Sequence, residues 1–268
     1  MAQDWLGLGD KTVIVTGGAL GLGRSIVVAL CSAGARVASF DVTTPVEGVD
    51  SETGAHLFRV DVTDPDEVER AVARVCAEVG EVTTLVNNAG VCLPRLLVDI
   101  RGEAPQFELD VATYDLMVGV NMKGAFLMAQ AVARRLVRAG AGAIINMSSE
   151  SGSEGSHAQS VYAATKAALN AFTLSWAKEL GPSGVRVVGV APGIMEATAL
   201  RSPAYAEALA YARGAGNDTV AAGYTSAIPL RREGRLEEVA DLVCFLASDR
   251  SSYVTGTTVT ISGGKSRG

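Results

Sequence analysis

The chain has 268 residues, of which 48% are hydrophobic, and its 23 basic and 29 acidic residues give a net charge of −6. This length and composition fit one large α/β domain with a single buried core. The acidic balance argues against a nucleic-acid-binding surface, which needs clustered lysine and arginine. Four scattered cysteines without a CxxC pair indicate reduced thiols in the cytoplasm. We find no signal peptide and expect no apolar run long enough to span a membrane.

Predicted strands and helices alternate along nearly the whole chain. Apolar, β-branched runs predict strands at 12–16, 36–40, 57–60, 84–86, 143–147, 185–190 and 258–261. Helical spacing of apolar residues covers 21–33, 65–79, 112–139, 160–180 and 236–248. Such strands, apolar on both faces and separated by helices, predict a doubly wound (Rossmann-type) parallel sheet of about seven strands in a single domain, 1–268. The stretch 192–235 contains no predicted sheet strand, and we expect it to cover the substrate.

A glycine-rich turn follows the first predicted strand and precedes the first helix. Its glycines are Gly17, Gly21 and Gly23, with Leu20 and Leu22 between them, in the spacing G-x-x-x-G-x-G. Glycines allow a tight turn in which backbone amides and the positive helix end meet a pyrophosphate. The spacing differs from the common G-x-G-x-x-G fingerprint. A turn that binds no ligand is therefore the alternative for this motif taken alone.

An acidic residue ends the second predicted strand. Asp41 lies eighteen positions after Gly23, near the distance expected for a carboxylate that binds the ribose hydroxyls of a dinucleotide. Such a carboxylate repels a 2′-phosphate, and no arginine or lysine follows Asp41 to bind one. The sequence therefore predicts NAD rather than NADP as the cofactor. The alternative is an ordinary solvated strand-end aspartate.

Further motifs follow in an order that identifies a family. They are Thr16-Gly17-xxx-Gly21-x-Gly23, Asp61-Val62, Asn87-Asn88-Ala89-Gly90, Asn121, Ser149, Tyr162-xxx-Lys166 and Pro192-Gly193. Each motif alone is weak, but the set, with every member in the expected strand, loop or helix, is specific. In these motifs the chain resembles the short-chain dehydrogenases/reductases over residues 8–264. The resemblance implies an enzyme that transfers a hydride between an alcohol or ketone and a nicotinamide cofactor.

The resemblance implies a catalytic set of Asn121, Ser149, Tyr162 and Lys166. A phenol has a pKa near 10, too high for a base at neutral pH. Because Lys166 lies one helical turn after Tyr162, its ammonium can favour the phenolate. Ser149 would bind the substrate oxygen, and its spacing of thirteen residues before Tyr162 favours it over Ser148. Asn121 resembles the asparagine that anchors a water near the lysine; a helix asparagine satisfied by a backbone carbonyl is the alternative.

The same resemblance implies a set of cofactor contacts beyond the glycine turn. They are Asp61 and Val62 at the adenine, then Asn88, Ala89 and Gly90 beside its ribose, then Pro192, Gly193 and Ile194 near the nicotinamide, with Tyr162 and Lys166 beside them. A threonine commonly follows the proline-glycine pair. Here Thr198 comes one residue later than is commonest, which leaves its role open.

Substrate recognition rests on loops. The segments 94–99, 148–156, 223–225 and 263–268 resemble those of family members that interconvert sorbitol 6-phosphate and fructose 6-phosphate with NAD. A phosphorylated polyol needs arginine or lysine for its dianion and polar side chains for its hydroxyls. The candidates are Arg95 and Arg201 for the phosphate and Glu150, Glu154 and His157 for hydroxyls. Ordinary solvated surface residues are the alternative for each. Without an HxxxH motif or cysteine cluster, no metal site is expected.

Two other functions are compatible with the motifs. A 3-oxoacyl-carrier-protein reductase normally uses NADPH, which Asp41 disfavours, and its acidic partner would need a basic patch. A regulatory protein that binds NAD without catalysis would not need Tyr162 and Lys166. By resemblance to the family, the helices 112–139 and 160–180 would form a homotetramer.

Overall fold

The computed structural model describes residues 5–198, 203–214 and 226–266. Its strands form one sheet in the order β3-β4-β2-β1-β5-β6-β7-β8. Their bounds are β1 Thr12–Thr16, β2 Arg36–Phe40, β3 Gly48–Val49, β4 His56–Phe58, β5 Thr84–Asn87, β6 Gly142–Met147, β7 Val185–Pro192 and β8 Thr257–Ile261. All pairs are parallel except β3 with β4. The predicted doubly wound sheet is confirmed. The two-residue β3 was not predicted, because so short a strand has no readable periodicity.

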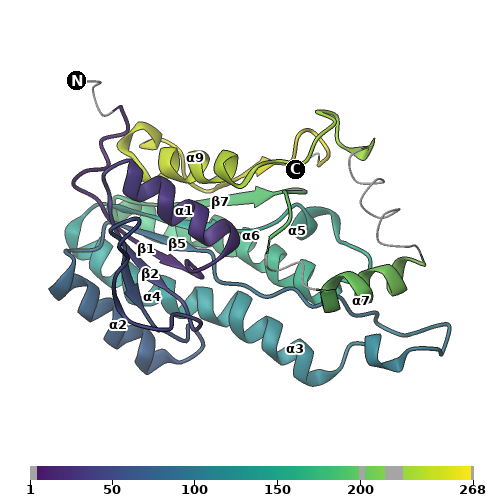
Figure 1. Cartoon of the computed structure of the whole chain (residues 1–268). Coiled ribbons are helices and arrows are strands. Elements are labelled where there is room, and N and C mark those ends of the chain that lie inside the picture. The colour runs from purple at the N-terminus through teal and green to yellow at the C-terminus, as the bar shows by residue number, and fades with distance from the viewer. Residues whose placement is uncertain (1–4, 199–202, 215–225, 267–268) are drawn as a thin grey trace.

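Helices cover both faces of the sheet. Their bounds are α1 Gly21–Ser32, α2 Pro65–Glu78, α3 Val111–Val118, α4 Ala125–Ala139, α5 Ser151–Glu154, α6 Ser160–Leu180, α7 Pro203–Arg213 and α9 Leu236–Ala247. Figure 1 shows α1 and α9 above the strands and α2 and α4 below them. One hydrophobic cluster fills each side, and the residues of β1, β5 and β6 alternate between the two clusters. This alternation explains why the predicted strands are apolar throughout.

The helical stretch between β5 and β6 differs from the uniform helix predicted for 112–139. A π-helical turn, η2 (Gly119–Gly124), separates α3 from α4. The whole stretch Val111–Ala139 is long and apolar enough to cross a membrane by composition, so the expectation that no such run exists is wrong. Its buried residues Met128, Val132 and Leu136 belong to the core cluster. In this fold the stretch is therefore a core helix of the domain.

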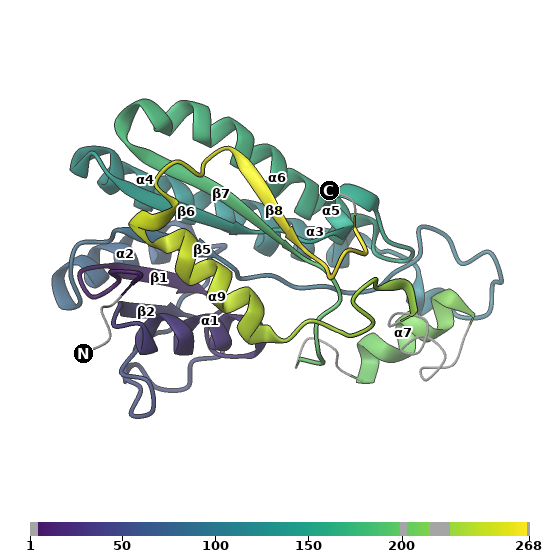
Figure 2. The ribbon, with the colours of Figure 1, turned by 90° about the horizontal axis from the view of Figure 1, so that it is seen from above.

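The register aligns the carboxyl ends of neighbouring strands with one another. Thr16 pairs with Phe40, Asn87 with Asn146, and Met147 with Val190. Loops that leave these carboxyl ends therefore start side by side, and ligands of doubly wound sheets bind there. Figures 1 and 2 both show α7 and the loop before α3 beyond this end of the sheet.

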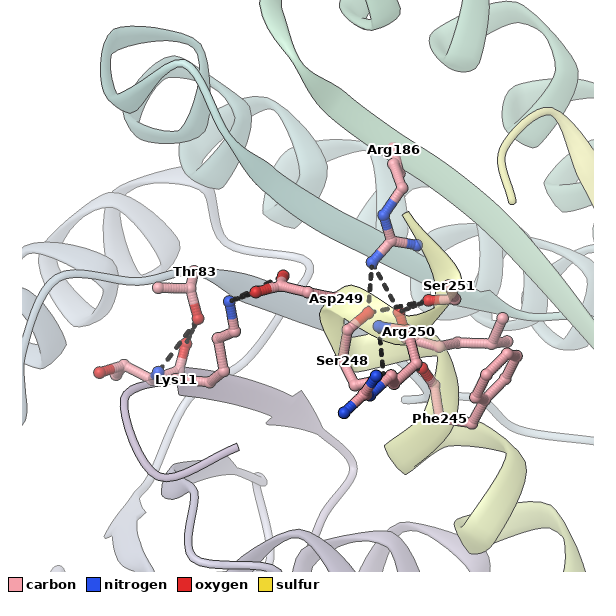
Figure 3. Close-up of polar contacts among 10 residues, drawn as sticks. Lys11, Thr83, Arg186, Phe245, Ser248, Asp249, Arg250 and Ser251 are labelled. Atoms are coloured by element: carbon pink, nitrogen blue, oxygen red, sulfur yellow. Dashed lines mark hydrogen bonds and ion pairs between the residues drawn. The ribbon is translucent and has the colours of Figure 1, made fainter. Parts of the chain in front are cut away.

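The opposite, amino-terminal end of the sheet is closed by polar contacts (Figure 3). Arg186 lies near the start of β7, and its guanidinium donates to backbone carbonyls at and beyond the end of α9: Leu246 (2.8 Å), Ser248 (3.3 Å) and Val254 (3.4 Å). Burial lowers the pKa of Arg186. Lys11 and Asp249 form an ion pair beside it, with 2.9 Å between Nζ and Oδ1. These contacts tie β1, β7 and α9 together.

Candidate active site

In the glycine turn after β1, backbone segments pack so closely that a side chain would not fit. Gly17 has a φ of +65°, which favours glycine. A Cβ at Gly17 would lie 2.9 Å from the Cα of Ala89, and one at Gly23 would lie 1.9 Å from the carbonyl oxygen of Gly17. The side-chain amide of Asn88 donates to the carbonyls of Thr16 (2.9 Å) and Gly17 (3.1 Å). Asn88 therefore holds the turn in place.

The amino end of α1 has the form of an anion site. Leu20 is its N-cap residue, and the leucine side chain makes no capping hydrogen bond. By contrast, aspartate side chains cap α2 and α3, where Asp64 and Asp110 accept from backbone amides. Thr198 lies over the same turn, because a Cβ at Gly21 would come 3.3 Å from the Cβ of Thr198. A glycine turn with uncapped helix amides fits the pyrophosphate of a dinucleotide.

Asp41 lies at the end of β2 and reaches the glycine turn. Its Oδ2 accepts from the amide of Ala19 at 3.1 Å, within the turn itself. Its Oδ1 accepts from the amide and hydroxyl of Thr43 at 2.9 and 2.7 Å. The carboxylate is therefore oriented by two loops next to the uncapped helix end, where the ribose of a bound dinucleotide would lie.

The other predicted cofactor segments also lie at the carboxyl ends of strands. Asp61 is exposed, and its Oδ1 accepts from the amide and hydroxyl of Thr63, both at 2.8 Å. Val62 is buried against Gly124, where a Cβ would come 2.7 Å from Cγ2 of the valine. Gly90 lies close to two predicted catalytic groups, because its added Cβ would be 3.3 Å from Asn121 Oδ1 and 3.6 Å from Lys166 Nζ.

The end of β7 approaches the end of β8. The amide of Gly193 donates to the carbonyl of Ile261 at 2.9 Å, and the carbonyl of Pro192 accepts from the amide of Glu150 at 3.0 Å. Ile194 lines a small pocket together with Ile261. The predicted nicotinamide-side segment is thus braced from both sides by neighbouring strand ends.

Asn121 lies in the π-turn and is fully buried. Its Oδ1 accepts from the amide of Val91 at 2.8 Å, and its Nδ2 donates to the carbonyl of Val91 at 2.9 Å and to Thr165 Oγ1 at 3.1 Å. The side chain thus bonds a backbone carbonyl, as in the alternative, but this carbonyl belongs to the loop after β5, and a second bond goes to α6. π-turns often mark functional positions, and here the turn places Asn121 between the loop after β5 and Lys166.

Tyr162 and Lys166 lie on one face of α6. The Nζ of Lys166 is 5.6 Å from the ring centroid of Tyr162 and donates to the carbonyl of Met147 at 2.7 Å. Burial lowers the pKa of Lys166 to about 8. Burial also raises the pKa of Tyr162, and a hydrogen bond from Ser149 opposes that rise. The three side chains therefore form one connected group next to Gly90.

The two adjacent serines after β6 have different surroundings. Ser148 is buried, and its hydroxyl donates to the backbone carbonyl of Lys166 at 2.9 Å. Ser149 is half-buried and accepts from the hydroxyl of Ser151 at 2.9 Å. Only Ser149 of the two contacts the phenol of Tyr162. The catalytic role of Ser149 stays a prediction.

Glycine also sets the approach of α5 to this group. A Cβ at Gly152 would lie 2.8 Å from the backbone carbon of Lys166 and 2.9 Å from the amide of Ala167. α5 can therefore pack directly on the backbone of α6 at the lysine. This contact was not predicted, because nothing in the local sequence distinguishes Gly152 from a loop glycine.

Three further side chains at this site have no motif in the sequence. Cys92 is half-buried, desolvation raises the pKa of its thiol to about 12, and the thiol lies near Lys166. It hydrogen-bonds Tyr205 of α7, whose hydroxyl accepts from Gln159 Nε2 at 2.7 Å. The only sequence signal for Tyr205 is its place within 192–235. Its approach to Tyr162 is decided by the packing of α7.

The predicted substrate residues divide into two groups. Oε1 of Glu150 accepts from Lys265 Nζ at 2.6 Å, and Glu154 accepts from the hydroxyl of Ser266. Among the described residues, Oε2 of Glu150 is buried and has no hydrogen-bond partner. Both acids contact the C-terminal segment, and the buried Oε2 of Glu150 is oriented by the Lys265 contact of the same carboxylate. His157 is exposed.

Arg95 lies beside the residues that precede α6. Its amide donates to the carbonyl of Ala158 at 2.7 Å, and its Nη1 donates to the carbonyl of Pro94 at 2.8 Å. Within the described ranges its buried Nε has no hydrogen-bond partner. Arg201, the other predicted phosphate ligand, lies outside the described residues. The substrate contacts of both arginines stay predictions.

The comparisons with known proteins agree with the fold and the order of the motifs. The family model described as enoyl-(acyl carrier protein) reductase matches residues 17–266. The chain belongs to the short-chain dehydrogenase/reductase family, whose dehydrogenases use nicotinamide cofactors.

Individual relatives cover almost the whole chain. It is 51% identical to sorbitol-6-phosphate 2-dehydrogenase of Klebsiella pneumoniae, over 98% of this chain and 99% of that protein. It is 34% identical to the 3-oxoacyl-[acyl-carrier-protein] reductase of Thermotoga maritima, over 96% and 98%. A crystal structure of a short-chain type dehydrogenase/reductase from Mycobacterium marinum superposes with a TM-score of 0.82 at 32% identity, and covers 99% of each chain. The chain is therefore an oxidoreductase of this family.

Proposed function

We propose that this protein is an NAD-dependent polyol dehydrogenase that interconverts sorbitol 6-phosphate and fructose 6-phosphate. The observation that carries the chemistry is the connected group of Tyr162, Lys166 and Ser149 beside the glycine turn. The substrate rests on the 51% identity with the Klebsiella pneumoniae sorbitol-6-phosphate 2-dehydrogenase along nearly the whole chain. The 3-oxoacyl reductase matches at 34%, which makes it the weaker guide to substrate.

In this proposal Tyr162 exchanges a proton with the substrate oxygen at its Oη. Since burial raises the pKa of Tyr162, the phenol is protonated at neutral pH and ready to donate to a ketone. In the oxidation direction the phenolate must form, and the Lys166 ammonium 5.6 Å from the ring stabilises it. Ser149 binds the same substrate oxygen and offsets its developing charge. When bound, the nicotinamide ring accepts or supplies the hydride.

Asp41 supports NAD as the cofactor. Its carboxylate is oriented by Ala19 and Thr43 next to the uncapped end of α1. There it would accept from ribose hydroxyls and repel the 2′-phosphate of NADP. Asp61, Val62 and the loop after β5 complete the adenosine side in this proposal.

In this proposal the protein is a homotetramer and lies in the cytoplasm. α3, α4 and α6 expose apolar side chains, namely Val111, Tyr114, Leu116, Phe126, Val137 and Leu174. Such residues on neighbouring helices suit contacts between copies of the chain, in line with a homotetramer. Free cysteines in the described part of the chain suit the cytoplasm. We also assign to 192–235 the role of covering the substrate.

The test is oxidation of NADH by the purified protein with fructose 6-phosphate, free fructose and a 3-oxoacyl thioester. We expect fructose 6-phosphate to be reduced with the highest kcat/KM, and sorbitol 6-phosphate to be oxidised with NAD. Activity confined to the thioester would overturn the polyol proposal. NAD binding without turnover of any substrate would favour the regulatory alternative.

A further inference from the structure

The segment after β8 is attached to the residues that follow Ser149. The ammonium of Lys265 lies 2.6 Å from Oε1 of Glu150 and 3.9 Å from Oε2 of Glu154. A turn holds this lysine at the end of β8, because its amide donates to the carbonyl of Ser262 at 3.2 Å. Figures 1 and 2 both show the segment after β8 next to α5. One cation from the C-terminal part of the chain thus contacts two acids, one at each end of α5.

Glu150 links this C-terminal segment to the predicted active site. Its amide donates to the carbonyl of Pro192 at 3.0 Å, at the end of β7. Its Oε2 lies 2.9 Å from the position of a Cβ at Gly193, in the predicted nicotinamide-side segment. In the sequence it directly follows Ser149, the residue proposed to bind the substrate oxygen. The carboxylate therefore lies beside the end of β7 and belongs to the same short loop as Ser149.

A negative charge at this place opposes the proposed reaction. In both directions, negative charge grows on the substrate oxygen or on the phenol of Tyr162 in the transition state. The side chain of Glu150 is 12% exposed, so water and salt screen its charge less than that of Glu154, which is 39% exposed. Among the described residues, Lys265 is the only cation in an ion pair with Glu150. Its ammonium therefore offsets a carboxylate charge that would otherwise act on the reacting oxygen.

We propose that Lys265 is a positioning residue that neutralises the Glu150 carboxylate and so allows negative charge to grow on the substrate oxygen. This inference rests on the proposed function for the chemistry of Ser149 and Tyr162, and not for the identity of the substrate. The lysine acts through Glu150 and does not itself touch the reacting atoms. It makes the segment after β8 a part of the active site.

A purely structural ion pair makes a different prediction. If the pair only tied the C-terminal segment to α5, loss of either partner or of both would slow the enzyme alike. If Lys265 neutralises charge, loss of the lysine leaves a carboxylate without its counter-ion, and replacing Glu150 by glutamine then removes the harmful charge. A second substitution that restores activity is therefore the sign of charge compensation.

The experiment compares wild type, Lys265→Met, Glu150→Gln and the double variant with both changes. Lys265→Arg tests rescue by a retained charge, and Lys265→Gln replaces Lys265→Met if that variant does not fold. Lys11→Met is the matched control, because it breaks a lysine–aspartate pair of 2.9 Å at the opposite end of the sheet. The substrate is fructose 6-phosphate with NADH. The measurements are kcat per folded protein, KM, the Kd of NADH from its fluorescence, and urea unfolding.

We expect Lys265→Met to lower kcat about tenfold, the effect of one uncompensated charge at several ångströms in a partly buried site. The double variant should regain most of that loss, and Lys265→Arg should stay within about threefold of wild type. The Kd of NADH should stay unchanged, and Lys11→Met should change neither constant. The predicted contact of Glu150 with a substrate hydroxyl is reported separately by KM.

Three outcomes would overturn the role of Lys265. One is a double variant no faster than Lys265→Met, which would indicate a structural tie. Another is an unchanged kcat in Lys265→Met. The third is a higher kcat in Lys265→Met, which would show that the carboxylate charge assists the reaction.

The proposed function and this inference fail differently. Turnover of fructose 6-phosphate by wild type decides the substrate, whereas the comparison of Lys265→Met with the double variant decides the inference. If wild type reduces free fructose or the 3-oxoacyl thioester instead, the same variants are compared with that ketone. If it reduces none of the three, both proposals are overturned.

Discussion

The two ends of the sheet use buried charge in opposite ways. At the amino-terminal end the half-buried Arg186 guanidinium donates to three backbone carbonyls (Figure 3). At the carboxyl end Lys166 is 4% exposed and donates to one carbonyl, that of Met147, in the described contacts. Its pKa falls to about 8 as a result. The three carbonyls tie the Arg186 guanidinium to α9 and the segment after it, whereas the Lys166 ammonium, with one recorded acceptor, loses its proton more easily and lies beside Tyr162.

The largest expected effect concerns the carboxyl end of the sheet, where the proposed catalytic residues lie. Tyr162→Phe removes the proposed proton carrier, and we expect kcat to fall about 10³-fold while NAD binding stays intact. The measurement is steady-state turnover with a separate NAD titration. Tyr253→Phe is the matched control, because that side chain is fully exposed. Turnover within tenfold of wild type would contradict the proposed role of Tyr162.

The next largest effect concerns the stability of the amino-terminal end of the sheet. Arg186→Met keeps the aliphatic stem but removes three hydrogen bonds to carbonyls, two of which (Leu246 and Ser248) still accept from Ser251, so we expect a loss of about 2 kcal/mol in the free energy of unfolding. Urea unfolding measures that loss, and kcat/KM of the folded enzyme should stay unchanged. Lys11→Met breaks an ion pair whose Asp249 partner is 84% exposed, and should cost under about 1 kcal/mol. If Arg186→Met lowered kcat/KM but left the free energy of unfolding unchanged, Arg186 would not have the structural role assigned to it.

The cost of burying Lys166 predicts a pH dependence of stability. Between a folded pKa of about 8 and an unfolded pKa near 10.4, the unfolded chain binds the proton that the folded chain has lost. Stability therefore rises with pH in that window, and the full cost is present below it. We expect the difference in free energy of unfolding, wild type minus Lys166→Met, to increase by about 1.5 kcal/mol from pH 8 to 9.5.

The check on Lys166 is urea unfolding of both proteins without cofactor at pH 7, 8 and 9.5. Groups common to the two proteins cancel in the difference. A difference that does not change with pH would show that burial does not shift this lysine.

The smallest effect concerns cofactor choice. Asp41→Ala removes the carboxylate that disfavours a 2′-phosphate, so we expect the preference for NAD over NADP to narrow about tenfold. The ratio of kcat/KM values for the two cofactors measures it. Asp249→Ala, at the other end of the sheet, should leave the ratio unchanged. An unchanged ratio in Asp41→Ala would remove the ribose contact from the proposal.

Much of the fold could be predicted because its signals are local. The bounds of β1, β2 and α6 agree with the predicted 12–16, 36–40 and 160–180. Apolar periodicity is a property of consecutive residues, so it survives without knowledge of the partners. The π-turn at Gly119–Gly124 escaped prediction, because it comes from contacts of Asn121 with the loop after β5 and with α6.

The sequence by itself determined the order of strands and helices, the family and the residue types of the catalytic motifs, because each of these is read from neighbours along the chain. Only the tertiary structure decided that Glu150 binds Lys265. It also brought Tyr205 to Gln159, from positions 46 residues apart. Such contacts between residues far apart in the sequence depend on how the helices pack on the sheet, and no short pattern of residues encodes that packing.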